Sequence, residues 1–162
     1  MRFIFTRRAY ILLALGIVPL SLSWKIPELR TAVFAFDALL IAAAVADYVL
    51  SRKLPDEFSI RREFSARFAI GDAVKVRLIV QNLASRSFYI KVKDEYPADM
   101  ALEEGREAEF SVPPQSDVEF YYHVTPPKRG SYEFGRTAVR YLSRLGLVWC
   151  QAELGSPQIV KV

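Results

Sequence analysis

The feature that most constrains this sequence is a pair of apolar segments within its first 50 residues. Residues 9–24 contain no charged side chain, and residues 31–50 form a second run that is rich in Ala, Leu, Val and Phe. As helices, the two runs would measure about 24 Å and about 30 Å, close to the roughly 30 Å of a bilayer hydrocarbon core. We therefore predict a transmembrane helical hairpin over residues 1–53, with helices at about 9–24 and 31–50.

The first apolar segment has a second interpretation when it is taken alone. Arg7 and Arg8 precede it and residues 21–23 (SLS) follow it, which is also typical of a cleavable signal peptide. The second segment starts after only a short loop containing Pro27, and this favours a hairpin over a signal peptide followed by a single anchor. Pro19 is then expected as a kink near the outer end of the first helix.

Positive charges around the apolar segments predict their orientation. Lys and Arg residues gather before the first segment and after the second, whereas the loop between them holds only Lys25 and Arg30. Cytoplasmic flanks of membrane helices carry the excess of Lys and Arg, so both termini should lie inside and the rest of the chain in the cytoplasm. The flanking basic residues are Arg2, Arg7, Arg8, Arg52, Lys53, Arg61 and Arg62.

Two acidic residues lie within the second apolar segment, where ionisable side chains are candidates for function. Asp47 falls within one helical turn of the inner end, where we expect an interfacial ion pair. Its expected partners are Arg7, Arg8 and Arg52. Asp37 lies deeper, roughly 9 Å from the outer end. We expect Asp37 to snorkel or to pack between helices, and contact with another membrane helix is the alternative.

After Leu54, the apolar residues change from a helical to an alternating pattern, which predicts strands. The clearest strand patterns cover residues 74–81, 88–93 and 118–125, and weaker ones cover 58–64, 108–112, 132–141 and 147–152. Gly135 interrupts one of these patterns and indicates a bulge or a close backbone approach. About seven short strands predict a mainly β domain over residues 54–162, an immunoglobulin-like antiparallel β-sandwich.

The net charge of +4 does not indicate nucleic-acid binding, because the predicted β domain is almost neutral. Of the 22 basic and 18 acidic residues, five and three lie in the first 50 positions, which leaves +2 for the rest. A local basic surface is still expected on the outward faces of two successive strands, facing anionic lipid or a partner. Its residues are Lys75, Arg77, Lys91 and Lys93, and an ordinary solvated face is the alternative.

The sequence contains no pattern of residues typical of a catalytic or metal site. His123 is the only histidine and Cys150 the only cysteine, so neither a metal-ligand set nor an internal disulfide is predicted. The paired acids should be solvated in loops. These acids are Asp94, Glu95, Glu103 and Glu104. We predict a non-enzymatic protein without a cofactor, and an enzyme using Cys150 or the acid pairs is the weakest alternative.

Four stretches that follow the apolar segments carry a resemblance to a known family. They are residues 70–82 (IGDAVKVRLIVQN), 94–97 (DEYP), 127–135 (PKRGSYEFG) and 143–149 (SRLGLVW). In this order they resemble the bacterial MoxR-associated membrane proteins, the domain-of-unknown-function family numbered 58. The resemblance implies a bacterial inner-membrane protein that works with a MoxR-type AAA+ ATPase in protein maturation or assembly. Together with the apolar segments and Asp37, it makes the lipid bilayer, this ATPase and another membrane protein the expected partners.

Members of that family continue into a von Willebrand factor A-like domain, and the present sequence stops at residues 158–162, about where that domain would begin. No metal-dependent adhesion site can therefore be transferred to these residues. Two hypotheses for the β domain follow. It is either a membrane-anchored interaction or scaffold module, or a structural spacer for a downstream domain.

Overall fold

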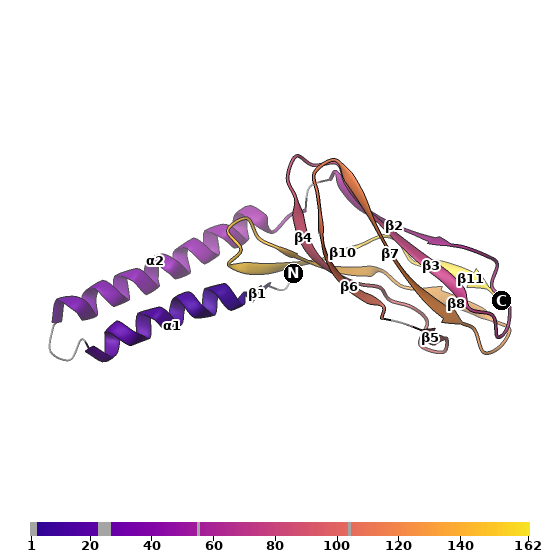
Figure 1. Cartoon of the computed structure of the whole chain (residues 1–162), viewed down its shortest axis with the longest axis horizontal. Coiled ribbons are helices and arrows are strands. Elements are labelled where there is room, and N and C mark those ends of the chain that lie inside the picture. The colour runs from indigo at the N-terminus through magenta and orange to yellow at the C-terminus, as the bar shows by residue number, and fades with distance from the viewer. Residues whose placement is uncertain (1–2, 23–26, 55, 104) are drawn as a thin grey trace. The chain divides into compact units, whose positions relative to one another are not determined.

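The computed structural model describes residues 3–22, 27–54, 56–103 and 105–162, and it is mainly β (Figure 1). The chain divides into two compact units. The first comprises Met1–Lys53 together with Leu142–Gln151, and the second comprises Leu54–Tyr141 together with Ala152–Val162. The chain therefore passes from one unit to the other three times.

Two helices that lie side by side make up most of the first unit (Figure 1). Helix α1 spans Arg7–Leu22 and helix α2 spans Pro27–Ser51, so both helices begin before the predicted positions. The predicted end of the first helix, at residues 23–24, lies outside the described residues. Among the residues that the structure describes, one helix is long and apolar enough to cross a membrane, namely Glu28–Ser51 of α2, with 24 residues and a mean hydropathy of 2.0.

The first unit also contains a small β element. Strand β1 (Phe3–Phe5) pairs antiparallel with the beginning of β10 (Val148–Leu154), so that Ile4 lies opposite Trp149. The turn before β10 contributes to a small core in which Leu147 packs with Ala9 of α1 and Ala44 of α2. Residues near the N-terminus and residues 142–151 therefore build this unit together.

Two antiparallel sheets form most of the second unit. The first has the order β2-β3-β7-β5. Its strands are β2 (Phe58–Phe64), β3 (Val74–Asn82), β7 (Ser116–Thr125) and β5 (Ala101–Glu103). In the second sheet, β4 lies between β6 and β9. These strands are β4 (Phe88–Lys93), β6 (Glu107–Val112) and β9 (Thr137–Leu142). A separate ribbon pairs β8 (Ser131–Phe134) with β11 (Gln158–Lys161).

The two sheets pack against each other because each strand turns its apolar residues toward the same interior. Leu78 of β3 and Ile90 of β4 are both fully buried, and the rings of Phe58 and Phe88, from different sheets, lie 5.2 Å apart. Burying such side chains contributes roughly 1.5–3 kcal/mol each. This core holds the second unit together without a disulfide.

The strand predictions are confirmed in their main lines. The patterns at 58–64, 74–81 and 88–93 became β2, β3 and β4 with nearly unchanged bounds. The pattern at 132–141 corresponds to two strands, β8 and β9, because Gly135 and Arg136 between them are not part of a strand. Three short strands, β1, β5 and β11, were not predicted, since strands of three or four residues have too few positions to show an alternating pattern.

Candidate functional site

A buried ion pair occupies the interior of the second unit, where the strand alternation places two charged residues. Phe58, Ile60 and Arg62 follow one another at inward positions of β2. In the same way, Asp94 continues the inward series of β4 after Val92. The side chains of Arg62 and Asp94 are 4% and 0% exposed. Buried charges of this kind persist only when they are paired and hydrogen bonded.

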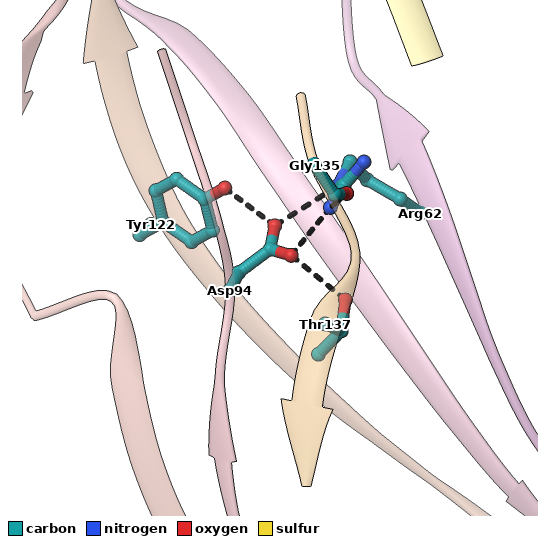
Figure 2. A network of polar contacts seen from close by, with 5 residues as sticks. All are labelled: Arg62, Asp94, Tyr122, Gly135 and Thr137. Atoms are coloured by element: carbon teal, nitrogen blue, oxygen red, sulfur yellow. Dashed lines mark hydrogen bonds and ion pairs between the residues drawn. The ribbon is translucent and has the colours of Figure 1, made fainter. Parts of the chain in front are cut away.

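The Asp94 carboxylate accepts four hydrogen bonds (Figure 2). Arg62 donates two of them, from Nε at 2.9 Å and from Nη2 at 2.5 Å, in the two-point geometry that suits a guanidinium. The hydroxyl groups of Tyr122 and Thr137 donate the others at 2.6 and 2.7 Å. Arg62 Nη2 also donates to the Gly135 carbonyl at 2.8 Å. The network therefore joins β2, β7 and β9 with the residues that follow β4 and β8.

The surroundings of the network favour a structural role over a catalytic one. Burial, and after it the negative charge of Asp94, raises the pKa of Tyr122, so its hydroxyl group keeps its proton and remains a donor. The Arg62 guanidinium also lies 5.2 Å from the centre of the Phe134 ring. Each oxygen of Asp94 is occupied by two donors, which leaves no free lone pair to act as a base. This arrangement fixes the two sheets to each other.

A cleft of about 770 Å³ opens beside this network in the second unit. Its charged lining is mixed, and the Arg106 guanidinium lies 5.1 Å from the centre of the Tyr96 ring. Its lining residues are Lys93, Asp94, Glu95, Tyr96, Pro97, Ala98, Arg106, Glu133, Gly135, Arg136, Ala138, Glu153 and Pro157. Clefts of this size hold small ligands or short peptide segments. Because acidic and basic side chains both line this cleft, it suits a peptide that carries charges of both signs. This cleft is the candidate binding site.

Gly135, which lines the cleft, lies close to Glu95. Its N–H donates to the Glu95 carbonyl at 2.9 Å, and a Cβ atom at this position would overlap the Glu95 carboxyl group. The predicted close approach is therefore confirmed.

The four acids that were predicted to be solvated in loops have different environments. Asp94 is buried rather than solvated, because Arg62 neutralises it, whereas Glu95 and Glu103 are exposed and Glu104 lies outside the described residues.

Asp47 of α2 has partners other than the predicted arginines. Its carboxylate accepts hydrogen bonds from the Ser143 hydroxyl at 2.5 Å and from the backbone N–H groups of Leu145 and Leu147 at 2.9 and 3.2 Å. A fourth bond, at 3.4 Å, comes from Ser51. These four donors satisfy the carboxylate without a cation. The ion pairs of the described residues involve neither Asp47 nor the proposed partners Arg7, Arg8 and Arg52.

Asp37 lies at the contact between the two helices. A Cβ atom on Gly16 of α1 would lie 2.7 Å from its Oδ1 atom, so the absence of a side chain at Gly16 makes room for the carboxyl group. That buried oxygen has no hydrogen-bond donor among the residues that the structure describes. This position is in keeping with helix packing, and contact with another membrane helix stays a prediction.

The four residues of the predicted basic surface lie on two different sheets. Lys75 and Arg77 point outward from β3, and Lys91 and Lys93 belong to β4. Because the inner faces of the sheets meet, these outward faces point in opposite directions and form no common patch. Acidic or aromatic neighbours also engage each cation: Arg77 pairs with Glu63 and Glu119, Lys91 with Glu109 and Lys93 with Glu107, and Lys75 lies 3.8 Å from the centre of the Tyr121 ring.

The remaining candidates for chemistry, Cys150 and His123, belong to different units. Cys150 is buried in β10, and His123 is half-buried on β7, with its ring 6.2 Å from that of Tyr121. Within the described part of the chain, no group of three or more His, Cys, Asp and Glu side chains could hold a metal ion. Comparison with models of known protein families finds no match, and comparison with curated proteins finds none either.

Proposed function

We propose that this protein is a non-enzymatic, membrane-anchored interaction module. The observation that carries the proposal is the surface of α2, on which large apolar side chains are exposed along the whole helix. Phe34, Leu39 and Leu50 have exposed fractions of 59%, 72% and 66%. Lipid is the solvent that such a surface requires. In this proposal α1 and α2 form a transmembrane hairpin in the bacterial inner membrane, and the cytoplasmic second unit is an immunoglobulin-like sandwich.

Membrane extraction of the full chain tests the anchor. The wild-type protein should stay in the membrane fraction through carbonate treatment, because α2 is long enough to span the bilayer. A variant with Leu39→Arg and Val45→Arg should be released, since each central Arg costs about 2.5–3.5 kcal/mol of insertion free energy. Release of the wild-type protein would contradict the anchor, and cleavage of the second unit by protease added to intact spheroplasts would contradict its cytoplasmic placement.

The interaction role rests on the cleft of the second unit. The Asp94 network gives this cleft a rigid wall, and its exposed arginine and glutamate side chains can pair with a partner segment of mixed charge. The resemblance described above makes a MoxR-type ATPase the first partner to test.

A capture experiment with the full chain in detergent tests this partner. Immobilised wild-type protein should retain the purified ATPase, and Arg136→Glu in the cleft should weaken retention several-fold. Arg129→Glu is the matched control, because Arg129 is exposed in the same unit but does not line the cleft. Equal retention by both variants would contradict the cleft as the binding site. Retention only by a longer protein that carries a downstream domain would favour the spacer hypothesis.

A further inference from the structure

The turn at residues 143–147, between β9 and β10, is bonded to the ends of both helices within the first unit. At the end of α2, Asp47 holds the turn and the Ser51 hydroxyl accepts a hydrogen bond from the Arg144 N–H at 3.0 Å. At the start of α1, the Thr6 hydroxyl donates to the Gly146 carbonyl at 2.8 Å and accepts a bond from the Ala9 N–H at 3.3 Å. Thr6 thus caps α1 and holds the turn at the same time.

Leu147 of the turn lies level with the apolar part of α2 along the helix axis. Leu147 packs with Ala44, which lies seven residues before the helix end at Ser51, or about 10 Å along the axis. The apolar helix measures roughly 36 Å, which exceeds a hydrocarbon core of about 30 Å by roughly 6 Å. Even if all of this excess lies at the inner end, Ala44 remains inside the hydrocarbon region. Leu147, which packs with Ala44, therefore lies near the inner edge of this region.

The exposed residues near this turn have the chemistry of a membrane interface. Leu145 at its tip is 63% exposed and Tyr10 is 56% exposed. Five basic residues of this unit are exposed at the same helix ends, and none forms an ion pair within the described residues: Arg7, Arg8, Arg52, Lys53 and Arg144. The acid at these helix ends, Asp47, is buried by the turn. Aromatic and basic side chains together are typical of the headgroup region.

We propose that the 143–147 turn is a third membrane contact, which binds acidic phospholipids of the inner leaflet and inserts Leu145 into the bilayer. This inference rests on the proposed membrane anchor. The occupant is lipid because the turn packs on α2, whose exposed apolar side chains face the bilayer in the proposed anchor, and the exposed Leu145 lies on this turn. The five cations attract phosphate-bearing headgroups, and the turn holds Arg144 and Leu145 at the depth where headgroups meet acyl chains.

Fluorescence quenching in vesicles tests the insertion. Cysteines introduced by Leu145→Cys, Leu39→Cys and Leu83→Cys, each in the full chain with Cys150→Ala, carry an environment-sensitive dye, and the quencher is attached to lipid acyl chains. Leu83 is the matched control, because it is 48% exposed in the second unit. We expect strong quenching at positions 39 and 145 and little at 83. Quenching at 39 with none at 145 would overturn the inference, whereas no quenching at 39 would overturn the anchor itself.

Lipid selectivity tests the headgroup part of the inference. With the dye at position 145, brominated phosphatidylglycerol should quench more than brominated phosphatidylcholine, because the acidic lipid is enriched around the turn. Replacing Arg144 by Gln should lower this enrichment by up to roughly fivefold, since one charge at a membrane surface contributes on that order. Arg129→Gln in the second unit should leave it unchanged. Equal quenching by the two lipids in the wild-type protein would overturn the proposal.

Discussion

Each unit of this protein contains one buried aspartate that accepts four hydrogen bonds, but the donors differ in kind. Asp94 lies in the second unit, called here the β unit, and takes two bonds from a guanidinium and two from hydroxyl groups. Asp47 lies in the first unit, the helical unit, and takes two bonds from backbone N–H groups and two from hydroxyl groups, with no cation. The first arrangement joins separate strands through paired charges. The second fixes the backbone of one turn.

The largest effect should follow the loss of Asp94, because its removal leaves the Arg62 guanidinium buried without a counter-charge. We expect Asp94→Ala to lower the stability of the β unit by about 3–5 kcal/mol. Thermal unfolding of the full chain in detergent measures this, with the exposed Asp99→Ala as the control. The double variant Arg62→Met with Asp94→Leu should recover much of the loss. A midpoint for Asp94→Ala equal to that of the control would refute the structural role of the pair.

Loss of Asp47 should act locally and more weakly. Asp47→Ala leaves the N–H groups of Leu145 and Leu147 without their acceptor, which costs about 1–3 kcal/mol. Hydrogen exchange of these two amides should become faster, while the amide of Val76 in the β unit should not change. Asp56→Ala supplies the control. If exchange at Val76 accelerates as much as exchange at the turn, the two carboxylates do not act separately.

Gly135→Ala tests the crowding beside the Asp94 network and should cost about 1 kcal/mol, because the new Cβ displaces the Glu95 carboxyl group. Glu95 is exposed and its end is flexible, so the combination with Glu95→Ala should restore stability. Chemical unfolding of the single and double variants measures this. An equal loss in both would place the strain in the backbone of Gly135 instead.

The smallest effect concerns two exposed acids, Glu107 and Glu109, whose ion pairs can be compared with the two buried aspartates. Hydrogen bonds from Lys93 and Lys91 lower the pKa values of Glu107 and Glu109. Their stabilising contribution is therefore complete above the unfolded carboxyl pKa, near 4.3, and is lost as the pH falls through the lower folded values. Glu107→Gln with Glu109→Gln should make the acid side of the stability profile slightly shallower. An unchanged profile would mean that solvent screens both pairs fully.

The sequence contains the signal for one of the two buried carboxylates but not for the other. The period of two that predicts β2 and β4 also places Arg62 and Asp94 at inward positions, and two opposite charges facing one core indicate a buried pair. No such pattern connects Asp47 to Ser143, which lies 96 positions later. The strands follow from the local alternation of apolar and polar residues. The partner of a helix end depends instead on which distant turn the folded chain brings next to it. The proposed cleft likewise combines residues from separate parts of the sequence.

The division of the helical unit between two parts of the sequence sets the order in which it can be made. The helices lie within the first 51 positions, but the turn that completes the unit spans residues 143–147. During translation, N-terminal segments emerge first and begin to fold before the rest of the chain exists. The Asp47 carboxylate must therefore wait, without its backbone donors, until most of the β unit has left the ribosome. Completion of the helical unit thus reports that the chain has been synthesised through β9, the last strand before the turn.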